Sequence, residues 1–201
     1  MPQIWQPLFD TIKMSLLGSV IGSLLVVPFA MLASSNIIHS RAVVSVMRLI
    51  LSIIRTLPTL VTALIATYVF GLGTLAGTTA IAVFTFGLVS QLVYEAIEAI
   101  DEGPIEAAVS VGAPNKVQVC CSRSVAPQIM SQVAGYTFYA LEVNVRASAV
   151  LGYVGAGGIG IILNSSLALL QYDRVSVIIL LILAVVAAVD GLSEAIRRRL
   201  A

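Results

Sequence analysis

Charged side chains are scarce in this chain. Lysine, arginine, aspartate and glutamate make up 10% of its 201 residues, whereas 59% of the residues are hydrophobic. Soluble domains carry about 25% charged residues, so the composition excludes an ordinary soluble domain and predicts an all-α integral membrane protein. The formal net charge is only +1, which gives no reason to expect a nucleic-acid partner.

Residues that bind metals or form disulfides are also few. The chain has one histidine, His39, and two adjacent cysteines, Cys120 and Cys121. A lone histidine has no partner cluster, so no metal site is expected. The cysteines fall in a segment that we assign to the cytoplasm, where a disulfide framework is not expected. The chain also lacks a G-x-x-x-x-G-K-[ST] phosphate loop, an H-E-x-x-H motif and a Ser/His/Asp set, so it is expected neither to bind ATP itself nor to be an enzyme.

Five apolar segments are long enough to cross a membrane. We expect them at about 12–33, 43–70, 78–99, 127–150 and 175–196. Residues 1–201 are therefore interpreted as a single transmembrane domain. The first segment is expected to remain in the mature protein because the N-terminus lacks the basic start of a signal peptide. Within it, Gly18 and Gly22 form a G-x-x-x-G pattern, which either marks close helix packing or is a chance pair of glycines.

The second apolar segment contains an arginine and a proline near its middle. Pro58 is expected to kink the helix. Arg55 falls deep in the segment, where an arginine is costly unless it faces the interior of a helix bundle or water. It has no evident partner on its own helix. Arg55 therefore either contacts another helix or subunit, or lines a path for an anion.

The fourth apolar segment carries the most polar cluster expected inside the membrane, Glu142, Asn144 and Arg146. Glu142 and Arg146 are four residues apart, so they lie on the same helix face and can neutralise each other. The alternative is that Glu142, Asn144 and Arg146 line a substrate path.

The stretch from 152 to 173 is too short and too interrupted to cross the membrane, and it predicts a short surface or re-entrant helix. It opens with a run of glycines that formally matches G-x-G-x-x-G but lacks the strand–helix–strand context of a dinucleotide site. Glycines here are expected to permit a tight turn and close packing in a loop on the outer side of the membrane. They are Gly155, Gly157, Gly158 and Gly160.

The only long polar stretch lies between the third and fourth apolar segments, at about 100–126. Pro104 suits the first position of a helix, and Asp101 and Glu102 favour a helix start just before it. Pro114 either ends this helix or starts a new one, so the piece is roughly ten residues, about 15 Å long. The stretch therefore predicts a short helix whose small side chains let a partner surface approach closely.

This stretch resembles the EAA loop of ABC-importer permeases, the cytoplasmic segment that docks onto an ATPase. The resemblance rests on Glu-Ala-Ala at 106–108, on Gly112 and on the Val125-x-Pro127 end. It implies the type I ABC importer permease fold, with five transmembrane helices and a cytoplasmic coupling helix. It further implies a second copy of the chain, two ABC ATPase subunits that hold the ATP and magnesium, and a periplasmic or lipid-anchored substrate-binding protein. The residues that it assigns to ATPase coupling are Pro104, Glu106, Ala107, Ala108, Gly112 and Pro127.

A narrower resemblance is to the permease of phosphonate ABC importers, the PhnE family. It rests on YEAIEAID at 94–101, YTFY at 136–139, E-x-N-x-R at 142–146 and VLGYVGAGGIG at 150–160. It implies transport of phosphonate or a related phosphorus oxyanion, to which Arg55 and Arg146 could donate charged hydrogen bonds. Many members carry an additional N-terminal span, which is not expected here.

Two other functions stay open at this point. One is an ABC permease for methionine or another small nutrient, which the ligand of the binding protein would distinguish. The other is a small membrane enzyme or a secondary transporter. The missing catalytic sets argue against the enzyme, and the EAA loop argues against the secondary transporter.

Positive charge predicts how the chain lies in the membrane. The three arginines at 197–199 favour a cytoplasmic C-terminus, and five spans then put the N-terminus on the periplasmic side. The same alternation places Arg41, Arg48, Lys116 and Arg123 inside, together with the EAA loop. The expected location is the bacterial plasma (inner) membrane, in contact with its lipids, as a multi-pass protein.

Overall fold

The computed structural model describes residues 2–38, 40–99, 110 and 126–200, and these residues form helices joined by short turns. No strand is present in this part of the chain, which confirms the all-α prediction. The elements in chain order are α1 (Pro2–Ala33), α2 (Arg41–Thr56), α3 (Thr59–Phe70), α4 (Thr74–Glu98), α7 (Ala126–Leu151), the 3-10 turn η1 (Gly152–Val154), α8 (Ile159–Ala168) and α9 (Tyr172–Leu200).

By length and composition, the described helices could form up to five membrane spans when each bent helix pair counts as one span. Three helical stretches are long and apolar enough to cross alone: 4–33 in α1, α4 over its whole length, and 172–196 in α9. The pair α2 and α3 is bent by 86°, and residues 129–154 with α8 form a second pair bent by 49°. The helix α8 is a short helix within the stretch 152–173, as expected, and its re-entrant or surface position stays a prediction.

The break between α2 and α3 is sharper than the predicted kink. We expected one kinked helix over 43–70, but the structure ends α2 at Thr56 and starts α3 at Thr59. Leu57 is extended, as the residue before a proline usually is, and its N–H bonds to Ile54 O. Pro58 serves as the N-cap of α3, and its carbonyl accepts hydrogen bonds from the N–H groups of Val61 and Thr62. The span is therefore two helices at a large angle.

Close packing of α1 on α4 confirms the function expected for the G-x-x-x-G pattern. A Cβ added to Gly18 would lie 2.6 Å from the Ile81 side chain, and one added to Gly22 would lie 2.6 Å from the Ala82 carbonyl oxygen. Only glycine allows this separation between the two helices. The pattern is therefore a packing site rather than a chance pair.

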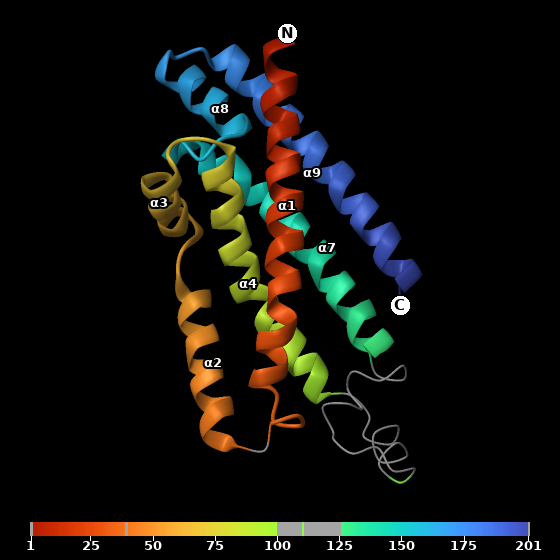
Figure 1. Ribbon diagram of the computed structural model, residues 1–201. Helices are drawn as coiled ribbons and strands as arrows, with labels where there is room; N and C mark the ends of the chain where they lie inside the picture. The colour runs from red at the N-terminus through yellow and green to blue at the C-terminus, as the bar shows by residue number, and fades with distance from the viewer. Residues whose placement is uncertain (1, 39, 100–109, 111–125, 201) are drawn as a thin grey trace.

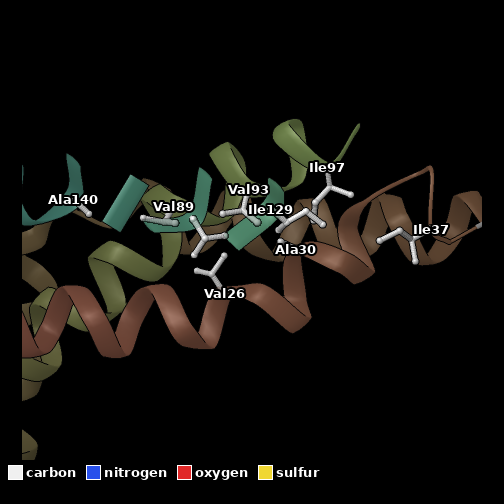
Figure 2. Close-up of a cluster of buried hydrophobic side chains, with 9 residues drawn as sticks. Val26, Ala30, Ile37, Val89, Val93, Ile97, Ile129 and Ala140 are labelled. Atoms are coloured by element: carbon white, nitrogen blue, oxygen red, sulfur yellow. The ribbon is translucent and has the colours of Figure 1, made fainter. Parts of the chain in front are cut away.

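All helix ends that flank the polar stretch lie at one end of the bundle, which we call the foot. Figure 1 shows α1 and α4 ending there, and α2 and α7 starting there, whereas η1 and α8 lie at the opposite end near the N-terminus. Apolar side chains of α1, α4 and α7 converge near the foot (Figure 2). The buried residues of this cluster are Val26, Ala30, Ile37, Val89, Val93, Ile97, Ile129, Val133 and Ala140.

Candidate functional site

The predicted ATPase-coupling residues fall almost wholly outside the described part of the chain. Of the six, only Pro127 is in a described element, as the second residue of α7. The flanks are placed, because α4 ends at Glu98 and α7 begins at Ala126, both at the foot (Figure 1). The coupling roles of Pro104, Glu106, Ala107, Ala108, Gly112 and Pro127 stay predictions.

An ion pair closes the foot directly beside the start of the polar stretch. Arg48 of α2 donates to Glu98, the last residue of α4, over 2.5 Å. The Arg48 Nε also donates to Ala33 O at 2.9 Å, and the guanidinium lies 4.9 Å from the centre of the Tyr94 ring. Glu98 accepts a further hydrogen bond from Ser35 N at 2.8 Å, and another from the Ser35 hydroxyl. This foot cluster joins the ends of α1 and α4 to the middle of α2.

Arg55, which is on α2, lies level with the middle of the neighbouring helix α4. Its backbone packs on Gly87, where an added Cβ would lie 3.0 Å from Arg55 Cα. Gly87 is eleven residues from Glu98 and thirteen from Thr74, or about 17 and 20 Å from the two ends of the helix. The Arg55 side chain is exposed on the single chain, and no described residue forms an ion pair with it. A charge at that depth needs water or protein beside it.

A small polar cavity adjoins Arg55 between α2 and α4. Its volume is about 40 Å³, enough for a few water molecules. Because Ser52 and Arg55 are exposed, the cavity reaches the surface of the chain. The cavity can hydrate a guanidinium, and an anion could contact the guanidinium from the open side. Its lining residues are Arg48, Leu51, Ser52, Arg55, Gly87, Ser90, Gln91 and Tyr94.

Arg146, the second predicted cation of the path, is surrounded by carboxylates. Its guanidinium lies 2.5 Å from Glu142 on the same helix and 3.9 Å from Asp190 on α9. The structure therefore confirms the pairing of Glu142 with Arg146 and adds a third member. Three charged groups join α7 to α9, and the roles of Glu142 and Arg146 in a substrate path stay predictions.

Asn144 is fully buried between three helices. Its side-chain Nδ2 donates to the Ser19 hydroxyl of α1 and to the Thr85 hydroxyl of α4, both at 2.7 Å. Its Oδ1 has no hydrogen-bond partner among the described residues. The amide thus holds α7 against α1 and α4, and a role of Asn144 in a substrate path stays a prediction.

The glycine run forms the turn that leads into α8. Gly155, Gly157 and Gly158 have positive φ angles of 75°, 90° and 75°, a region that favours glycine. A Cβ on Gly160 would lie 2.2 Å from Ala149 O. The Thr11 hydroxyl of α1 accepts a hydrogen bond from Ile159 N at 2.7 Å. This agrees with the predicted tight turn, at the end of the bundle opposite the foot.

Sequence reasoning did not identify Glu98, Asp190, Ser19 or Thr85 as members of these clusters. Asp190 stands alone in an apolar run, and an intramembrane carboxylate by itself indicates a nearby cation. Ser19 and Thr85 give no such indication, because short hydroxyls are common in membrane helices and often bond to their own backbone. Among the described residues, no group of three or more His, Cys, Asp or Glu could hold a metal ion.

Comparison with known proteins gives consistent results along nearly the whole chain. The family model described as "Binding-protein-dependent transport system inner membrane component" matches residues 26–201. The phosphite transport system permease protein PtxC of Stutzerimonas stutzeri is 39% identical over 193 residues, which are 96% of this chain and 70% of that protein. The phosphate-import permease protein PhnE of Mycolicibacterium smegmatis is 36% identical over 191 residues, which are 95% of this chain and 36% of that protein.

A solved structure has the same fold. The inward-facing methionine ABC transporter MetNI contains a chain that superposes with a TM-score of 0.85, covering 100% of this chain and 99% of that one. The sequence identity is 21%, so the likeness concerns the fold alone. The fold of this chain is thus that of a type I ABC importer permease.

Proposed function

Because this chain belongs to the family of binding-protein-dependent transport system inner membrane components, we propose that it carries phosphonate or a related phosphorus oxyanion through the membrane. Members of this family are multi-pass inner-membrane permease subunits rather than enzymes, and ATP is hydrolysed by a separate subunit. The two relatives described above are named for phosphite and for phosphate transport. Their names support the oxyanion class and leave the individual ligand to experiment.

The observation that carries the proposal is the position of Arg55. A cation that is exposed near mid-span, without a partner among the described residues, would cost about 2.5–3.5 kcal/mol in contact with lipid. The cost disappears when the side chain faces a hydrated path that an anion uses. A guanidinium also matches the oxygen geometry of a phosphonate.

We infer an assembly of two copies of this chain, two ABC ATPases and a periplasmic or lipid-anchored binding protein. One chain has too few helices to enclose a path that also alternates its opening, and a two-fold axis along the membrane normal supplies the second half. The EAA loop would then dock on the ATPase at the foot, with the N-terminus periplasmic and the C-terminus cytoplasmic. Native mass measurement of the purified complex should give two permease chains, and a functional complex with one would contradict this assembly.

Uptake by the reconstituted complex tests the function. Proteoliposomes holding the permease and its ATPase, supplied with the binding protein, should accumulate radiolabelled phosphite, phosphate or methylphosphonate only when ATP is hydrolysed. Unlabelled methionine in excess should not compete. ATP-driven uptake of methionine without uptake of any phosphorus oxyanion would overturn the proposal and favour the alternative function.

A further inference from the structure

Polar side chains recur along one face of α2 at spacings of four and three residues. At 3.6 residues per turn they fall within an arc of about 80° and extend over about 21 Å of helix. The buried residues Val44 and Leu51 lie on the side of this arc that packs on the bundle. The remaining surface of α2 is apolar and exposed, as at Val46 and Ile53. We call the polar face the α2 stripe; its residues are Arg41, Ser45, Arg48, Ser52 and Arg55.

The α2 stripe runs from the foot to the middle of the membrane span. Arg41 is the first residue of α2 at the foot (Figure 1), and Arg55 packs at the level of Gly87 in mid-α4. An arginine side chain is far shorter than the roughly 17 Å of α4 between that level and Glu98, so Arg55 cannot place its charge at the foot. The stripe must therefore face water or protein rather than the lipid interior.

Two hollows adjoin the α2 stripe at different depths. The upper one is the small polar cavity beside Ser52 and Arg55. The lower one, at the foot, has a volume of about 340 Å³ and includes Arg41 and Ser45 in its lining. The lower hollow has room for a small oxyanion, whereas such an anion would only touch the upper one from outside. Each hollow thus has at least one arginine at its edge.

The three arginines of the α2 stripe differ in how far their charge is neutralised. Arg48 is paired with Glu98 at 2.5 Å, whereas no described residue forms an ion pair with Arg41 or Arg55. An anion at Arg48 would therefore meet the Glu98 carboxylate as well as the guanidinium, and repulsion by that carboxylate weakens its binding. Along the helix, an unpaired cation alternates with a neutralised one.

We propose that the α2 stripe is a series of binding positions for a phosphorus oxyanion crossing the membrane, in which Glu98 weakens the position at Arg48. This inference rests on the proposed function. Transport requires each position to bind strongly enough for entry and weakly enough for exit. A free guanidinium at Arg55 attracts the anion in mid-membrane, and the neutralised Arg48 lets it move on to the hollow at the foot.

Thiol labelling separates a hydrated stripe from a helix face in lipid. In a chain with Cys120→Ser and Cys121→Ser, single Ser45→Cys and Ser52→Cys changes test the stripe, and Ile53→Cys is the matched control because it is exposed and adjacent but on the apolar face. The complex of permease and ATPase is placed in nanodiscs of phosphate-free galactolipid. An anionic methanethiosulfonate reagent should label positions 45 and 52 at least about tenfold faster than position 53, because cations concentrate anions near them.

Inorganic phosphite should then protect positions 45 and 52, with chloride at equal ionic strength as the comparison. The additional change Glu98→Gln keeps a carbonyl oxygen for the Ser35 hydrogen bonds but removes the negative charge. Protection of position 52 should then need about tenfold less phosphite, because one charged contact contributes about a factor of ten to binding. Protection seen only with phosphatidylglycerol in the disc, and not with phosphite, would assign the stripe to lipid headgroups and overturn the proposal.

Two other outcomes separate this inference from the function it rests on. If the wild-type complex takes up phosphorus oxyanions but the Ser52→Cys and Ile53→Cys variants label at equal rates, the α2 stripe is overturned and the function is left intact. A wild-type complex without such uptake overturns the function itself. An unchanged or higher phosphite requirement in Glu98→Gln overturns the weakening role of Glu98.

Discussion

Two arginines of this permease lie inside the membrane-spanning part, and their surroundings differ. Arg146 on α7 has Glu142 at 2.5 Å and Asp190 at 3.9 Å. Arg55 on α2 has no ion-pair partner among the described residues and lies beside a small polar cavity. The first arginine has two carboxylates close by that balance its charge. The second keeps a full positive charge available for a mobile anion.

The comparison extends to the polar groups around each arginine. Near Arg146, the Asn144 amide bonds to hydroxyls of two other helices, so this end of α7 uses its polarity to hold the bundle together. On α2, the serines of the stripe are exposed and line the two hollows, and no hydrogen bond from them to another described helix is found. Polarity inside a membrane therefore has two separable uses here, and substitutions should affect stability on α7 and transport on α2.

The largest effect is expected from Asn144→Leu, which removes both interhelical hydrogen bonds from a fully buried position. Hydrogen bonds between membrane helices average about 0.6 kcal/mol and reach about 1.7, so the loss should be about 2 kcal/mol in the unfolding free energy of the purified complex. Thr137→Val is the control, because the Thr137 hydroxyl bonds only to its own helix, and it should change stability little.

Adding Ser19→Ala and Thr85→Val to Asn144→Leu should recover part of that stability, because no hydroxyl is then left without its partner. A triple variant that is no more stable than Asn144→Leu would show that the loss comes from packing. If Asn144→Leu had normal stability but no uptake, Asn144 would act in transport rather than in holding the helices together.

The next effect concerns Arg55. Replacing Arg55 by Gln should reduce ATP-driven uptake about tenfold, the value of one charged hydrogen bond, while the melting temperature of the complex stays unchanged. Arg55→Lys keeps the charge without the planar donor geometry and should fall between. Arg174→Gln, an exposed arginine at the start of α9, is the matched control and should transport normally. Unimpaired uptake by Arg55→Gln would leave all selectivity with the binding protein.

The sequence predicted most of the fold because each span is a long apolar run between polar residues. It also predicted the Glu142–Arg146 pair, which follows from helix periodicity alone. The 86° angle between α2 and α3 at Pro58 could not be predicted from the sequence, because a proline removes a backbone hydrogen bond without setting the angle of the bend. That angle depends on how α3 packs on α4. Asp190 was missed for a similar reason, since its distance from Arg146 depends on how α7 and α9 lie side by side.

A smaller effect is expected from Arg146→Gln, which leaves Glu142 and Asp190 close together without their shared cation. Arg146 is about half exposed on the single chain, so the cost should be about 1 kcal/mol of stability, the upper end for exposed pairs. Uptake per folded complex should not change. Combining Arg146→Gln with Glu142→Gln and Asp190→Asn should restore stability by removing the stranded charges. Lost uptake in a fully stable triple variant would make Arg146 a transport residue like Arg55.

The smallest effect is expected from Gly87→Ala, which acts on the separation of α2 and α4 at the level of Arg55. The new Cβ would lie 3.0 Å from Arg55 Cα and 3.1 Å from Arg55 N, so α2 must shift by a few tenths of an ångström. Alanine is a better helix residue than glycine by about 0.8–1.0 kcal/mol, which offsets the crowding, and stability should change little. The shift displaces the Arg55 guanidinium, and uptake should fall about threefold, a modest fraction of the effect of losing its charged contact.

Gly135→Ala on α7 is the matched control for Gly87→Ala, because no atom of the described chain lies within 4 Å of an added Cβ there. It should leave uptake unchanged and raise the melting temperature slightly, since alanine favours the helix. Reduced uptake in Gly135→Ala but not in Gly87→Ala would reverse the comparison, because the sensitive helix face would then be on α7. Equal loss in both would show that transport responds to helix packing in general rather than to the position of Arg55.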